Sequence, residues 1–117
     1  MGLKEKDCVP CRGGIPPMSE PDEDLAAAQL PTWSLERTGV HRIRREFRFG
    51  TFRQAIGFVD GVADLAEEQG HHPNIDVRYN VVVMEIYTHK IEGLHENDFI
   101  LASKIDDVFK RSPGSHP

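Results

Sequence analysis

Residues 79–89 read YNVVVMEIYTH and form the strongest strand pattern in the chain. Alternate side chains of a strand point to opposite faces of a sheet. One predicted face consists of Val82, Met84 and Ile86, and the other of Val81, Val83, Glu85 and Tyr87. Because the second face is also largely apolar, we expect a subunit partner to cover the sheet there.

The segments on either side predict the neighbours of this strand. A strand over about 75–78 comes directly before it. Further upstream, residues 33–36 and 40–49 alternate in polarity and are joined at Gly39, which predicts a hairpin. Such tight links favour antiparallel pairing, so the four strands are expected to form one antiparallel sheet.

Three helices are predicted around this sheet. The first covers residues 25–29 after an acidic start, and the last carries the apolar residues of 99–109. The second spans 52–69, follows an N-cap at Thr51 and stops at Gly70. The predicted fold class is α+β in the order αββαββα, a four-stranded antiparallel sheet with three helices on one face.

Length and composition predict one soluble domain. The chain has 117 residues, of which 38% are hydrophobic and 28% charged. A net charge of -5 does not provide the excess of positive charge that direct binding to a nucleic-acid backbone needs. No stretch approaches the ~20 apolar residues of a membrane span, and Met1 to Asp7 lack the apolar core of a signal peptide. We therefore expect a cytoplasmic protein that does not contact a membrane.

The positions of the proline and glycine residues predict the domain boundaries. Residues 1–21 are expected to be an irregular N-terminal arm, 22–111 the folded domain, and 112–117 a disordered tail. The arm contains both cysteines, Cys8 and Cys11. A single pair provides only two of the four ligands of a structural zinc, so reduced, non-catalytic thiols are expected.

Histidines at the ends of the predicted elements are the candidate site. His71 and His72 follow a helix stop, and Pro73 disfavours helical backbone at His72. His89 comes at the predicted end of the long strand. Imidazoles can donate and accept protons near neutral pH, but they also bind metals. The spacing alone leaves proton transfer, metal binding and ordinary surface histidines as open interpretations.

These residues belong to a pattern that resembles the pterin-4a-carbinolamine dehydratase family. The matching segments are EEQGHHPN at 67–74, YNVV at 79–82, TH at 88–89, GL at 93–94 and Asp98. The likeness covers about residues 20–110. Its combination of a doubled histidine before proline, a Tyr-Asn strand start and a Thr-His strand end is quite specific.

The resemblance implies roles for individual residues. It makes His71, His72 and His89 the catalytic set, with His71 and His89 as acid and base and His72 mainly binding the pterin. The implied substrate-binding set is Glu67, His71, His72, Pro73, Thr88, His89, Lys90, Ile91 and Asp98.

Two carboxylates in this set have a structural alternative. Glu67 lies near the negative end of a helix, where it is expected either to have a local partner or to be a solvated surface residue. Asp98 stands three residues after His95, which replaces the usual Ser or Thr of a helix start. Its favoured interpretation is a capping carboxylate, and the alternative is that it orients His89.

The function that the resemblance implies is the removal of water from 4a-hydroxytetrahydropterin to give quinonoid dihydropterin. No cofactor and no metal is expected. The expected partners are the pterin substrate, further copies in a homodimer or homotetramer, and an aromatic amino acid hydroxylase.

Two other functions remain open. Relatives act as dimerisation cofactors of a homeodomain transcription factor or assist assembly of a carbon-fixing enzyme, so a non-catalytic binding module is one alternative. The assembly branch tends to lose the catalytic histidines, whereas this chain keeps all three. A small metalloprotein that uses the same histidines is the other alternative.

Overall fold

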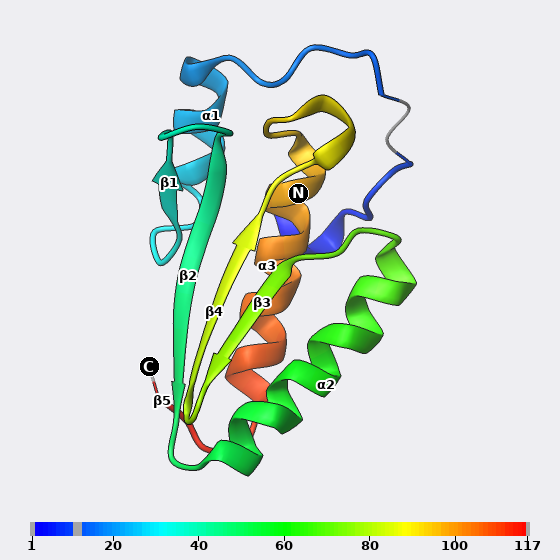
Figure 1. The fold of residues 1–117 in the computed structure, drawn as a ribbon. Helices are drawn as coiled ribbons and strands as arrows, with labels where there is room; N and C mark the ends of the chain where they lie inside the picture. Colours follow the sequence, from blue (N-terminus) through cyan, green and yellow to red (C-terminus); the bar gives the residue numbers. More distant parts are fainter. Residues whose placement is uncertain (1, 11–12, 117) are drawn as a thin grey trace.

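The fold is an antiparallel sheet with helices packed on one face (Figure 1). A computed structural model describes residues 2–10 and 13–116. The helices are α1 (Glu20–Ala27), α2 (Phe52–Gln69) and α3 (Glu96–Arg111), with short 3-10 helices η1 (Leu3–Glu5) and η2 (His89–Ile91). The strands are β1 (Ser34–Glu36), β2 (Arg42–Phe49), β3 (Asn74–Arg78), β4 (Val81–Ile86) and β5 (Ser115–His116). The α+β class and the order αββαββα are thus confirmed, and β5 is an addition to the four predicted strands.

Strand order in the sheet is β1-β2-β4-β3, so β4 is a central strand. Its predicted core face is confirmed, because Val82, Met84 and Ile86 are fully buried. This face packs on an aromatic cluster of Trp33, Phe47, Phe49, Phe58 and Phe109. Burial of side chains of this size is the main stabilising term of such a small domain.

Helix α2 has the predicted bounds, and its ends are closed as the sequence suggests. The Thr51 hydroxyl accepts from the Gln54 amide, and the Gln54 side chain accepts from the Thr51 amide, each at 3.1 Å. This reciprocal capping box satisfies two donors at the start of the helix. At the other end Gly70 has φ +65°, a left-handed conformation that glycine adopts without steric cost.

The long predicted strand over 79–89 is shorter in the structure. Tyr79 and Asn80 form the turn between β3 and β4, and Tyr79 has φ +53°. Two residues must reverse the chain there because β3 ends at Arg78 and pairs with β4 directly. At the other end, His89 begins the 3-10 helix η2 instead of closing the strand.

The tail was expected to be disordered from Ser112, and in the structure part of it is a strand. Ser115 and His116 pair with Phe49 and Arg48 of β2. β1 pairs only with the beginning of β2, so the later part of that edge is free to bind the tail. Pro117 lies outside the described residues, and the domain boundaries themselves stay a prediction.

The second face of β4 lacks a helical cover, and its side chains are half-buried. Charges interrupt its apolar character, because Arg42 and Glu85 form an ion pair at 3.1 Å across β2 and β4. Coverage of this face by another subunit stays a prediction. Among the described residues, no helix is long and apolar enough to cross a membrane.

Candidate active site

His71 is positioned by the way helix α2 ends. The amides of Gly70 and His71 both donate to the carbonyl of Ala66, which closes the last turn and fixes the start of the following segment. The His71 ring is mostly buried, with 13% of its side chain exposed. The histidine therefore leaves the helix in a defined direction.

Asp98 holds the His71 ring from the start of α3. Its Oδ1 lies 2.6 Å from His71 Nε2, and the carboxylate is fully buried. Its Oδ2 accepts from the Thr88 hydroxyl at 2.9 Å and from the His95 amide at 2.8 Å. The favoured interpretation of Asp98 as a capping residue agrees with the last contact. The alternative named the wrong partner, because Asp98 contacts His71 and not His89.

This arrangement has a chemical consequence for His71. A carboxylate accepts a hydrogen bond from the nearer ring nitrogen, so Nε2 carries the hydrogen and Nδ1 is the atom that can exchange a proton with a ligand. The carboxylate also stabilises the imidazolium that forms when the ring accepts a proton. Since three donors fix Asp98, the orientation of His71 is set before any ligand binds.

Thr88 links this pair to the loop that follows β4. It is 3% exposed and forms an isolated bridge with Gly93, with Thr88 N donating to Gly93 O at 2.9 Å. The turn between them contains η2 and places His89 and Lys90 on the surface. The ring of His89 lies over that of Tyr87, with centroids 4.2 Å apart. The stacked ring and the closed turn together restrict the position of His89.

His72 lies beside His71 but is much more exposed. Its Nε2 is 2.5 Å from Glu67 Oε2, and the two side chains are 58% and 78% exposed. The expectation of a local partner for Glu67 is met by this contact. Because exposed pairs contribute at most about 1 kcal/mol, the pair restrains the ring only weakly.

The histidines share one cleft of about 280 Å³. Its lining consists of Val9, Gly70, His71, His72, Pro73, Asn74, Thr88, His89, Lys90 and Asn97. Six members of the implied binding set are therefore brought together. Asp98 lies behind the cleft as the partner of His71, and neither Glu67 nor Ile91 is among the lining residues.

Sequence reasoning missed Val9, Gly70, Asn74 and Asn97. Gly70 and Asn74 adjoin the doubled histidine and could have been included on adjacency alone. Asn97 could be suspected only as the neighbour of Asp98. Val9 carries no local signal, because it reaches the cleft through hydrogen bonds to a residue 88 positions away.

Of the two cysteines, the structure describes Cys8, which is a free thiol, whereas Cys11 lies outside the described residues. Burial, together with the nearby charge of Asp98, raises the pKa of the Cys8 thiol to about 11. The neutral thiol that results is a poor nucleophile and a poor metal ligand. In the described part of the chain, no three His, Cys, Asp or Glu side chains are grouped so that they could hold a metal ion.

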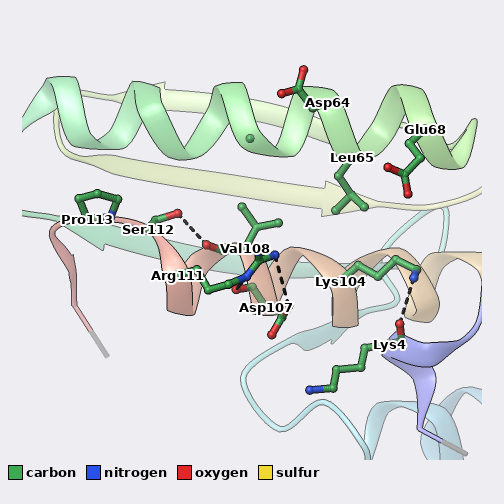
Figure 2. A pocket seen from close by; sticks show the side chains of 11 residues that line it. Lys4, Asp64, Leu65, Glu68, Lys104, Asp107, Val108, Arg111, Ser112 and Pro113 are labelled. Carbon is green, nitrogen blue, oxygen red and sulfur yellow. Dashed lines mark hydrogen bonds and ion pairs between the residues drawn. The ribbon is translucent and has the colours of Figure 1, made fainter.

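A larger groove of about 520 Å³ lies between α2 and α3, away from the histidines. Figure 2 shows Leu65 pointing from α2 toward α3. Basic residues such as Lys104 and Arg111 and acidic ones such as Glu68 alternate along it. These mixed charges do not form a group of side chains suited to proton transfer. The smaller cleft, which contains the histidines, is therefore the candidate active site.

The family model and the most similar relatives that were compared point to one and the same family. The family described as pterin 4 alpha carbinolamine dehydratase matches residues 16–108. A relative from Rubrobacter xylanophilus that carries this family's name is 48% identical over 104 residues, covering 89% of this chain and 95% of the relative. Another from Halorhodospira halophila is 48% identical over 106 residues, covering 91% and 96%.

Solved structures show the same fold. A transcriptional coactivator/pterin dehydratase from Brucella melitensis superposes with a TM-score of 0.74 at 30% identity, covering 79% of this chain and 97% of that one. A pterin dehydratase-like protein identified as a RuBisCO assembly factor in the alpha-carboxysome has a TM-score of 0.57 at 26% identity, covering 66% and 88%. On the evidence of the family match and these relatives, the chain belongs to the pterin-4a-carbinolamine dehydratase family.

Proposed function

We propose that this protein removes water from 4a-hydroxytetrahydropterin to give quinonoid dihydropterin. The observation that carries the proposal is the buried Asp98 carboxylate, 2.6 Å from His71, at the back of a cleft that also contains His89. A carboxylate that orients one imidazole, with a second imidazole across the same cleft, supplies both an acceptor and a donor of protons.

The roles follow from the surroundings of each ring. His71 accepts a proton from a ring nitrogen of the substrate, because Asp98 stabilises the positive charge that His71 then carries. His89, as the imidazolium, protonates the departing hydroxyl. The C4a–O bond breaks, the nitrogen's electron pair forms the new double bond, and water leaves. His72 helps to hold the pterin.

The reaction needs no bound cofactor in this scheme, since the substrate's own nitrogen electrons drive the departure of the hydroxyl. We further propose that the enzyme supports recycling of tetrahydropterin in the cytoplasm beside an aromatic amino acid hydroxylase. Self-association as a homodimer or homotetramer is proposed through the face of β4 that has no helical cover.

Two structural neighbours are described as a transcriptional coactivator/pterin dehydratase and as a RuBisCO assembly factor, which suggests a binding function as the alternative. The oriented His71 favours the enzyme, because a binding module does not need a buried carboxylate to fix an imidazole.

A stopped-flow dehydration assay tests the proposal. The wild type should accelerate loss of water from purified 4a-hydroxytetrahydropterin, and each of His71→Ala and His89→Ala should lower kcat by about 10²–10⁴-fold. The double variant should lose almost all acceleration. His116→Ala is the matched control, because His116 lies in β5, outside the cleft. A wild type that gives no acceleration would overturn the proposal.

A further inference from the structure

In the structure, the described part of the N-terminal arm before the N-cap of α1 consists of residues 2–10 and 13–18 (Figure 1), and its residue Val9 lines the histidine cleft. Most of it precedes the family match, which begins at residue 16. Its first part is anchored to α3. Leu3 is 8% exposed and joins the hydrophobic core, and Lys104 Nζ donates to the Lys4 carbonyl at 3.0 Å. The arm is therefore an ordered part of the fold at this end.

A second anchor lies at the cleft itself. The Val9 amide donates to Asn97 Oδ1 at 2.9 Å, and Asn97 Nδ2 donates to the Val9 carbonyl at 2.6 Å. Asn97 is 2% exposed, so this double contact is shielded from water. The neighbouring Cys8 amide donates to Gln69 Oε1 at 2.8 Å. Two helices thus fix the backbone at residues 8–9.

The same anchors flank the proposed proton acceptor. Gln69 is two residues before His71, and Asn97 directly precedes Asp98. The arm is consequently held by the segments that position the His71–Asp98 pair, and its distance from that pair is fixed.

The apolar residue Val9 belongs to the lining of the cleft. It lines the cavity while 57% of the residue stays exposed. Among the described residues that line the cleft, Val9 and Pro73 are the two with apolar side chains. An exposed apolar group held rigidly beside polar groups has contact area available for a ligand, and burying it on binding is favourable.

We propose that the arm forms a wall of the pterin cleft and that Val9 is a substrate-binding residue, held in place by Asn97 and Gln69. This proposal rests on the proposed function and adds a binding contact to it. The ring face of a pterin offers the apolar surface that Val9 needs. At about 280 Å³ the cleft is at the small end of the range for ligand sites, which brings its lining residues close to a bound bicyclic ring.

Steady-state kinetics of Val9 variants test the proposal. Val9→Ala removes two methyl groups and should raise KM about three- to tenfold, and Val9→Asp should raise it further. Both should leave kcat within about twofold, since the lost contact is equal in the ground and transition states. Val40→Asp, at a half-exposed valine of the β1–β2 turn, controls for the added charge and should leave KM unchanged.

Loosening the arm provides an independent variant. Gln69→Ala removes the acceptor of the Cys8 amide and should raise KM in the same direction as Val9→Ala. Its matched control is Glu68→Ala, the adjacent residue of α2, which faces the groove between α2 and α3. This control should behave as the wild type.

Fluorescence titration with an oxidised pterin separates this proposal from the proposed function. If the wild type binds pterin but the Val9 variants bind equally well, the arm proposal is wrong and the dehydratase proposal stands. If it binds but does not dehydrate, the dehydratase proposal fails, and the Kd values of the Val9 variants still decide the role of the arm. A wild type that does neither overturns both, and a fall in kcat at constant KM overturns the binding role of Val9.

Discussion

The Asp98 carboxylate joins two helix ends by placing Oδ1 2.6 Å from His71 Nε2. His71 follows the end of α2, and Asp98 belongs to the first turn of α3. The other oxygen of Asp98 caps α3 through the His95 amide. One residue thus stabilises a helix start and orients a proton-transfer group, so its two roles must be separated by experiment.

Asp98→Asn tests the orienting role. An amide that keeps the contacts to Thr88 and His95 turns its NH₂ toward His71, and Nε2 must then accept instead of donate. The hydrogen moves to Nδ1, the atom that should face the substrate. We expect kcat to fall by about 10²–10⁴-fold. Stopped-flow dehydration measures the rate, and ¹⁵N NMR of the His71 ring reports the tautomer.

The control for this prediction is His95→Ala. It removes the His95 ring nitrogen that accepts from the Asn97 amide but keeps the backbone amide that Asp98 accepts from. Loss of a cap should lower the free energy of unfolding by about 1 kcal/mol and leave kcat nearly unchanged. A drop in kcat for His95→Ala as large as that for Asp98→Asn would mean that helix stability, and not the tautomer, controls the rate.

Replacing His72 or Glu67 should lower the dehydration rate far less than replacing His71 or Asp98. Their pair is mostly exposed, so Glu67→Gln should change KM by less than about fivefold, which corresponds to about 1 kcal/mol. His72→Ala should raise KM by about tenfold with kcat almost unchanged, because His72 holds the substrate without moving a proton. A loss of kcat in His72→Ala comparable to that in His71→Ala would reverse these roles. Steady-state kinetics on all three variants decides the matter.

The elements of the fold could be predicted because local signals agree with tertiary packing. Helix α2 has a reciprocal cap at Thr51, an apolar stripe and a glycine stop at Gly70, and its predicted bounds are those of the structure. The alternating residues of β4 likewise gave its buried face. The start of β4 was predicted two residues too early because Tyr79 is a residue typical of strands that here adopts a positive φ in a turn.

The site could be predicted only in part, for a physical reason. Adjacency and family resemblance point to His71, His72 and His89, and the structure places them around one cleft. The favoured capping role of Asp98 agrees with its contact to the His95 amide, whereas its contacts to His71 and Thr88 join distant segments and were not predicted. The contribution of Val9 depends on contacts between distant segments, for which local sequence contains no signal.

The thiol of Cys8 should be unreactive at neutral pH. Burial disfavours the thiolate and raises the pKa to about 11, so the thiolate fraction at pH 7.5 is about 10⁻³ to 10⁻⁴. In a Cys11→Ser variant, alkylation by iodoacetamide should therefore be slow and should accelerate about tenfold per pH unit up to the pKa. The double variant that also carries Cys8→Ser gives the background. A rate that levels off near pH 8.5 would show an ordinary exposed thiol.

Asp106, a largely buried carboxylate of α3, should be costly to replace. It accepts from Arg45 at 2.6 Å and from the Trp33 ring at 2.8 Å, and the two charged side chains are only 14% and 16% exposed. Burial raises the pKa of Asp106 although Trp33 and Arg45 act in the opposite direction. Asp106→Ala leaves the half-buried Arg45 unpaired and should lower the free energy of unfolding by about 3 kcal/mol.

The matched control is Asp107→Ala, on the adjacent position of α3. Asp107 pairs with Arg111 one turn later, and the two side chains are 42% and 70% exposed, so its loss should cost less than about 1 kcal/mol. Urea unfolding of both variants measures the difference. Equal losses would mean that burial does not strengthen the Asp106 contacts. Since Asp106 lies outside the histidine cleft, Asp106→Ala should keep wild-type kcat wherever it remains folded, and this separates the stability of the core from the chemistry of His71.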